Sequence, residues 1–118
     1  MAKNDLLIYS EALAVEMEKL CKGNKSFPSN TVFQLRKSSS SVYANIREAQ
    51  YGQSRADMLS KFEIALKECN ETEGWLQLLF QANNITVEEF KKHRNLCGRT
   101  KRLLISSCKT LKEKQKDE

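Results

Sequence analysis

The sequence has few residues that interrupt helices, with one proline and four glycines among 118 residues. Aromatic residues make up only 8% of the chain. Because proline and glycine supply most turns of β-rich and loop-rich proteins, their scarcity excludes most such architectures and favours long helices. The 40% of residues that are hydrophobic suffice for a single core, so we expect one domain over residues 1–118.

Long apolar segments are also missing. No stretch approaches the roughly 20 apolar residues that a membrane-spanning helix needs. The N-terminal region contains Asp5, Glu11, Glu16 and Glu18, which excludes the apolar region of a cleaved secretion signal. We therefore expect a cytoplasmic protein that does not associate with membranes.

Paired cysteines are absent as well, since the four cysteines lie far apart and form no C-x-x-C motif. A structural zinc site normally uses such paired ligands, so we predict no metal centre. In a reducing compartment, isolated cysteines are most simply small apolar residues of the core. This interpretation applies to Cys21, Cys69, Cys97 and Cys108.

Four segments carry apolar residues at steps of three and four, the spacing of an amphipathic helix. Ser54 with Asp57, and Thr86 with Glu89, have the spacing of capping boxes that start the third and fourth segments. The predicted helices span about residues 5–21, 30–50, 55–81 and 87–112, and residues 113–118 are predicted to fray. Short connections place successive helices antiparallel, which predicts an all-α, up-down-up-down four-helix bundle.

Residues that an enzyme needs are scarce, because there is one histidine and neither a phosphate-binding loop nor a dinucleotide-binding motif. Glu89, His93 and Cys97 follow one another at intervals of four, which could present three metal ligands along one helix. The alternative is an exposed histidine paired with Glu89 while Cys97 faces the core. We favour this alternative and predict a non-enzymatic protein without a cofactor.

A run of four serines, residues 38–41, lies inside the second predicted helix. Serine is a mediocre helix former, but its small side chain lets helices approach closely, and its hydroxyl can bond a carbonyl one turn earlier. We therefore interpret the run as a packing feature in preference to a set of phosphate contacts.

A second apolar stripe occurs on the first and third predicted helices, on the side away from the core-facing residues. Isolated exposed apolar residues are common, but a stripe that a monomer would leave in water is typical of a subunit interface. We favour the interface and predict a homo-oligomer. The candidate contact residues are Ile8, Val15, Ile64 and Trp75.

The formal net charge of +5 is concentrated near the C-terminus. Residues 86–118 contain ten basic and five acidic residues, and no acidic residue lies between Lys91 and Lys112. Such a basic stripe would bind a phosphate backbone without reading sequence. The alternative is a solvated surface that contributes only solubility. The candidate nucleic-acid contacts are Lys91, Arg94, Arg99, Lys101, Arg102, Lys109 and Lys112, with Arg36, Lys37 and Arg47 from the second helix.

Three segments resemble a known family. The sequence IALKECNETEGWL at residues 64–76 is similar to the signature of bacterial four-helix bundle proteins known as 23S rRNA intervening-sequence proteins. The segments SSSVYANIREA (39–49) and QSRADM (53–58) resemble the family's second-helix motif and the turn that follows it. The common family form reads NIAEG where this chain reads NIREA, so Arg47 and Ala49 depart from the family pattern.

This resemblance implies an up-down bundle that assembles as a homopentameric ring around a central channel, without recognised catalytic residues. A related branch, the accessory variability determinant proteins of diversity-generating retroelements, comprises basic pentamers that bind nucleic acid and a reverse transcriptase. The partners implied for this chain are thus further copies of itself, RNA or DNA, and a protein such as a reverse transcriptase. Our leading prediction is a non-enzymatic, oligomeric, nucleic-acid-binding bundle; the alternative is a protein-protein interaction scaffold with no nucleic-acid role.

Overall fold

Four helices make up most of the chain that the structure, a computed structural model, describes, namely residues 5–23 and 26–116. They are α1 (Asp5–Lys22), α2 (Ser29–Ala49), α3 (Arg55–Gln81) and α4 (Val87–Lys116). No β-strand occurs among these described residues. The prediction of an all-α chain with four helices is confirmed.

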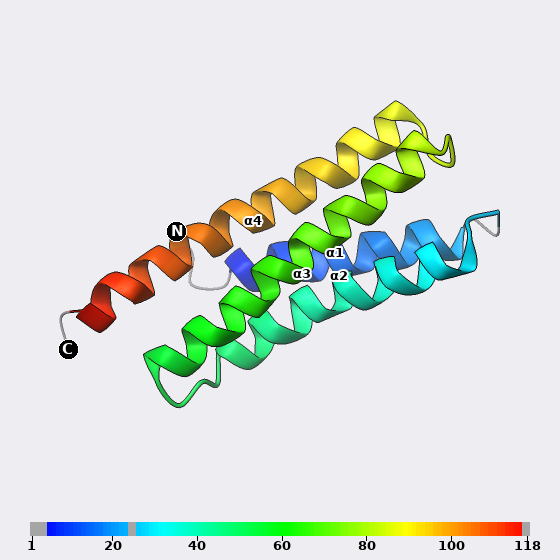
Figure 1. The fold of residues 1–118 in the computed structure, drawn as a ribbon. Coiled ribbons are helices and arrows are strands. Elements are labelled where there is room, and N and C mark those ends of the chain that lie inside the picture. The colour runs from blue at the N-terminus through cyan, green and yellow to red at the C-terminus, as the bar shows by residue number, and fades with distance from the viewer. Residues whose placement is uncertain (1–4, 24–25, 117–118) are drawn as a thin grey trace.

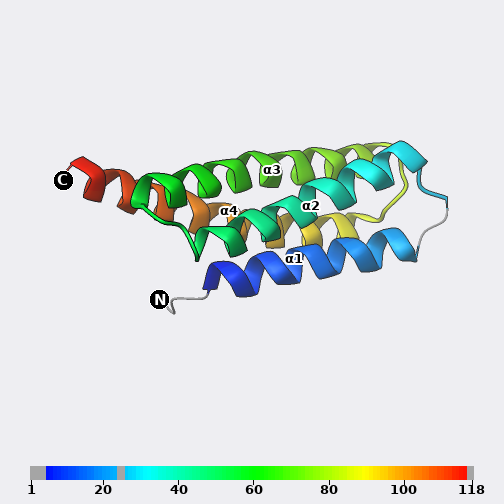
Figure 2. The same ribbon diagram turned by 90° about the horizontal axis from the view of Figure 1, so that it is seen from below.

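Successive helices run antiparallel and lie at the corners of an elongated bundle (Figure 1, Figure 2). α2 packs against α1 and α3, and α4 packs against α3 and α1. Within the described ranges α1 does not pack against α3, nor α2 against α4, so these pairs occupy opposite corners. The bundle measures 51 × 21 × 20 Å, and the C-terminal end of α4 extends beyond the start of α1 in both views.

Local sequence signals fix where α3 and α4 begin. At α3 the Ser54 hydroxyl accepts a hydrogen bond from the Asp57 amide at 3.1 Å, which satisfies a donor that a helix start leaves unpaired. At α4 the Thr86 hydroxyl accepts from the Glu89 amide at 3.1 Å, while the Glu89 carboxylate accepts from the Thr86 amide at 2.9 Å. The predicted capping box at Thr86 is therefore reciprocal. In the box at Ser54, the Asp57 carboxylate instead accepts from the amide of Gln53, the residue before the cap, at 3.4 Å.

The C-terminal end of α4 differs from the sequence prediction. The helix was expected to end near residue 112 and residues 113–118 to fray, but α4 continues through Lys116. Buried Leu111 anchors the last turns, and Lys114 and Lys116 place positive charge at the negative end of the helix dipole. Residues 117 and 118 of the predicted tail lie outside the described residues.

The core consists of side chains at the predicted helical spacings. Leu13, Met17, Leu35, Leu76 and Leu104 are fully buried and come from all four helices. The four cysteines are buried and free, which confirms their interpretation as core residues. No helix in the described part of the chain is long and apolar enough to cross a membrane.

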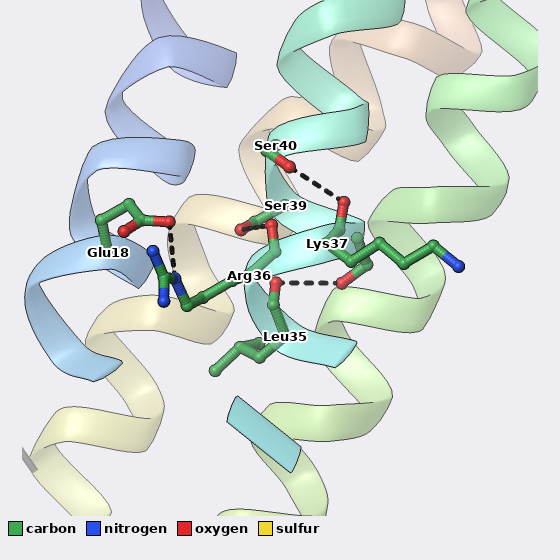
Figure 3. A network of polar contacts seen from close by, with 7 residues as sticks. Glu18, Leu35, Arg36, Lys37, Ser39 and Ser40 are labelled. Atoms are coloured by element: carbon green, nitrogen blue, oxygen red, sulfur yellow. Dashed lines mark hydrogen bonds and ion pairs between the residues drawn. The ribbon is translucent and has the colours of Figure 1, made fainter. Parts of the chain in front are cut away.

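The serine run packs α2 against its neighbours. Ser38 and Ser39 are buried. The hydroxyls of Ser38, Ser39 and Ser40 donate to carbonyls three residues earlier at 3.1 to 3.3 Å, as Figure 3 shows for Ser39 and Ser40. The Thr72 hydroxyl of α3 donates to the Ser38 hydroxyl at 2.9 Å and so links two helices. The packing interpretation is confirmed for the two buried serines.

Candidate nucleic-acid interface

The outward side of α4 carries a row of exposed cations, here called the basic face, which consists of Lys91, Arg94, Arg102, Lys109 and Lys112. Their spacings of three, seven and eight residues keep them on one side of the helix. The row covers about 31 Å at 1.5 Å per residue. Because no acidic residue interrupts this span of sequence, the positive charges reinforce one another.

Few of these charges are neutralised within the chain. The Lys112 ammonium lies 3.4 Å from the Glu63 carboxylate of α3, a surface ion pair that polyanions can displace at little cost. The Arg94 guanidinium lies 5.1 Å from the centroid of the Phe90 ring and keeps its charge. Within the described ranges no ion pair engages the other three, Lys91, Arg102 and Lys109.

Two further predicted cations lie at the margins of this face. Lys101 is half-buried. Arg99 is exposed and turned to α1, where its guanidinium lies 4.7 Å from the centroid of the Tyr9 ring and donates to the Tyr9 hydroxyl at 2.6 Å. Arg99 therefore lies beside the basic face, on the side of α1, with its guanidinium held by Tyr9.

Two open hollows flank Arg99 and Arg102, each with a volume of about 450 Å³. The α1–α4 hollow is lined by Asp5, Tyr9, Arg99, Arg102 and Leu103. The α3–α4 hollow is lined by Glu73, Arg94, Asn95, Gly98, Arg99 and Arg102. Because both hollows share the two arginines, Arg99 and Arg102 form a cationic ridge between them.

The cations predicted on α2 lie at the opposite corner of the bundle from α4. Arg36 donates to the Glu18 carboxylate at 3.0 Å, and Figure 3 shows Arg36 turned to α1 while Lys37 extends away from this pair. Arg47 donates to the Tyr43 hydroxyl at 2.9 Å. The structure therefore does not place Arg36, Lys37 and Arg47 on the same surface as the basic face.

The residues predicted to form a subunit interface lie on α1 and α3, at opposite corners of the bundle. On α1, Ile8 is 60% and Val15 44% exposed, and Ile64 on α3 is 42% exposed. Trp75 is half-buried and packs against the core, so it adds less to an outward apolar surface than its spacing predicts. Leu78, fourteen residues after Ile64 and 49% exposed, extends the apolar side of α3. The subunit interface itself stays a prediction.

Comparison with known proteins assigns the chain to a family. The family model for the 23S rRNA-intervening sequence protein matches residues 4–106. The chain belongs to this family. It is also similar to a solved protein of unknown function from the S23 ribosomal protein family of Bacteroides thetaiotaomicron, at 39% identity and a TM-score of 0.84 over 88% of this chain and 98% of that one. None of the curated proteins matches the chain.

The family match ends inside α4. The matched region includes Arg94, Arg99 and Arg102, together with both hollows, and stops before Lys109 and Lys112. The arginine ridge is therefore within the family region, and the last two cations of the basic face lie beyond it.

The three residues weighed as metal ligands have other roles in this family member. The Glu89 carboxylate caps α4, and Cys97 is buried in the core as the favoured alternative predicts. The prediction of an exposed His93 paired with Glu89 is wrong, because His93 is 6% exposed and its Nδ1 has no hydrogen-bond partner among the described residues. No group of three or more histidine, cysteine or acidic residues in the described ranges could hold a metal ion.

His93 lies beside an ion pair that joins α1 to α4. The Lys92 ammonium is 3.2 Å from the Glu16 carboxylate, and this hydrogen bond lowers the pKa of Glu16. Burial lowers the pKa of His93, and the charge of Lys92 lowers it further against the opposing effects of Glu16 and Glu89. The imidazole is therefore held in its neutral form.

We expect the free energy of unfolding to decrease as the pH falls below about 6.5, the pKa of an exposed histidine. The pKa of His93 is lower in the folded chain, so the unfolded chain binds more protons between the two values and stability is lost through that interval. The loss from one group cannot exceed about 1.4 kcal/mol per pH unit. Denaturant unfolding at about pH 7.5 and 5.5 measures this loss of stability. If the His93→Leu variant showed the same pH dependence as the native protein, His93 would not be its cause.

The sequence analysis did not identify the contribution of Tyr9. Tyr9 is half-buried and meets Arg99 from the other end of the chain. No local pattern indicates such a pair, because the two residues are 90 positions apart. Only the packing of the first helix against the last one brings them together.

Proposed function

We propose that this protein is a non-enzymatic oligomer that binds RNA or DNA through the basic face of α4. The observation that carries the proposal is a row of exposed cations over about 31 Å of one helix. No acidic residue interrupts that span. Because Lys91, Arg102 and Lys109 have no ion-pair partner among the described residues, phosphates can bind them without displacing a carboxylate.

The chemistry expected at this face is backbone recognition. Lysine and arginine side chains neutralise phosphates and release the cations condensed on the polyanion, which is favourable whatever the base sequence. Phosphate contacts position a protein on its nucleic acid but carry no sequence information. We therefore expect affinity for ribosomal or generic RNA, governed by salt rather than by base order.

We also propose that copies of the chain assemble head to tail, with the apolar side of α1 in one subunit against the apolar side of α3 in the next. α1 and α3 occupy opposite corners of the bundle, so a contact between them joins two different surfaces. Such heterologous contacts close into a ring when the rotation between subunits permits. The family resemblance implies five subunits, and each would present one copy of the basic face.

Binding to a fluorescently labelled RNA should weaken by about 100-fold between about 50 and 200 mM salt. This estimate assumes that the five cations of the basic face each neutralise one phosphate of a single strand, which gives a log–log slope near −3.5. Fluorescence anisotropy at several salt concentrations measures the slope. No RNA binding at low salt, together with a polypeptide that co-purifies in stoichiometric amount, would favour the protein scaffold instead.

A further inference from the structure

The α1–α4 hollow brings groups of unlike chemistry together at the edge of the basic face. It is lined by an acid (Asp5), an aromatic ring (Tyr9), two guanidinium groups (Arg99 and Arg102) and an aliphatic side chain (Leu103). A phosphate group alone would make no favourable contact with the aromatic ring or with the leucine side chain. An unpaired nucleotide, by contrast, is recognised by a stacking surface, a cation for its phosphate and an acceptor for its base N–H groups.

Contacts with Tyr9 hold Arg99 at the hollow. Its guanidinium lies 4.7 Å from the centroid of the Tyr9 ring and donates to the Tyr9 hydroxyl at 2.6 Å. The Arg99 side chain remains exposed, so part of its guanidinium is open to solvent. Guanidinium planes stack on unpaired bases in RNA complexes, so an exposed guanidinium that is held in place is suited to a base.

A comparable hollow between α1 and α2 lacks these properties. It contains Tyr43 and Arg47, but the Tyr43 hydroxyl accepts from Arg47 at 2.9 Å and donates to the Glu11 carboxylate at 3.3 Å. Arg47 shares a network with an acid, and it is the one cation among the described residues that line this hollow. Among the described residues, the α1–α4 hollow has two arginines to one acid and continues into the basic face.

We infer that the α1–α4 hollow binds one unpaired base of a single-stranded RNA, stacked on Arg99, while the adjoining phosphate lies on Arg102. This inference rests on the proposed function and adds to it a preference for single-stranded over double-stranded RNA. A base inside a duplex is already paired and stacked, so it cannot enter the hollow without first leaving its partner. The basic face alone would bind single and double strands through their phosphates.

Asp5 gives the hollow a base preference. An ionised carboxylate is an acceptor only. Guanine presents two adjacent donors, N1–H and the N2 amino group, to which a carboxylate can bond in a bidentate manner, whereas uracil presents one donor and cytosine one amino group on this edge. The hollow is therefore expected to favour guanine over cytosine by about tenfold, the discrimination typical of one bidentate contact.

The test compares three labelled RNAs of equal length by fluorescence anisotropy at low salt: alternating uridine–guanosine, alternating uridine–cytidine, and a duplex. The native protein should bind the guanosine strand about tenfold more tightly than the cytidine strand. Tyr9→Leu and Arg99→Lys should each weaken binding to the guanosine strand by about tenfold and leave duplex affinity within twofold. Asp5→Asn should make the two single strands bind alike.

The matched control is Tyr51→Leu, which removes a tyrosine that is 81% exposed at the end of α2 and should change none of the three affinities. Arg99→Lys keeps the net charge and spares the fold, so a loss of strand preference in this variant cannot be attributed to charge or unfolding. Equal effects of Tyr9→Leu and Tyr51→Leu, or equal effects on single strand and duplex, would overturn the hollow as a base site. That outcome would leave the proposed function standing, whereas no RNA binding by the native protein would overturn both.

Discussion

Replacing Arg102 and Lys109 together by glutamate is expected to weaken RNA binding by about 100-fold at low salt. Both side chains are exposed and without an ion-pair partner among the described residues, so the change converts two phosphate contacts into two repulsions. The slope of log affinity against log salt concentration should also become shallower by about 1.4, since each lost contact to a single strand contributes about 0.7. Fluorescence anisotropy across a salt series measures both quantities.

The matched control is the double variant Lys22→Glu with Lys67→Glu. Both lysines are exposed, lie on α1 and α3 and are not part of the basic face, and both double variants lower the formal net charge from +5 to +1. Exposed substitutions of this kind change the free energy of unfolding by about 0.5 kcal/mol or less. An equal loss of affinity in the two variants would show that binding follows net charge alone, and unchanged binding in Arg102→Glu with Lys109→Glu would contradict the proposed site.

Aspartates at Ile8 and Val15 are expected to dissociate the oligomer into subunits of 13.6 kDa. These side chains are 60% and 44% exposed in the isolated chain, so their replacement should spare the fold. In a head-to-tail assembly they would be covered by the next subunit, where two unpaired carboxylates are costly to bury. Light scattering coupled to gel filtration measures the mass of the native protein and of the variant.

Phe33→Asp is the control for this experiment. Phe33 is 60% exposed like Ile8, but it lies on α2, which takes no part in the proposed contact. The control should keep the mass of the native oligomer. A native protein of 13.6 kDa in solution, or an undiminished mass in the Ile8→Asp, Val15→Asp variant, would contradict the assembly.

The helices were predictable because their signals are local. Leu13 and Met17 fall at helical spacing on α1, and Thr86 with Glu89 forms the reciprocal cap that the spacing predicts. The end of α4 was missed because apolar periodicity stops at Leu111, while the last turn depends on terminal charge rather than on burial. Local patterns therefore predict where a helix begins better than where it ends.

The candidate site was only partly predictable, because it depends on which helices are neighbours. The spacing of Arg102 and Lys109 places both on one side of α4, as the sequence predicts. Arg36 and Arg47 belong to a helix at the opposite corner, and periodicity within one helix cannot show that. His93 was expected to be exposed and paired with Glu89, yet its position at helical spacing between Phe90 and Cys97 faces the core.

The diagonal placement of α2 and α4 determines what a ring would do with nucleic acid. If subunits join through α1 and α3, every α4 lies on the same side of the ring and every α2 on the opposite side. A strand bound to one subunit is then tethered close to the next basic face, and its effective concentration there can raise overall avidity by about 10²–10⁴ over a single contact. A strand too short to reach the neighbouring subunit gains nothing. Such a ring would bind strands long enough to reach two subunits more tightly than shorter ones.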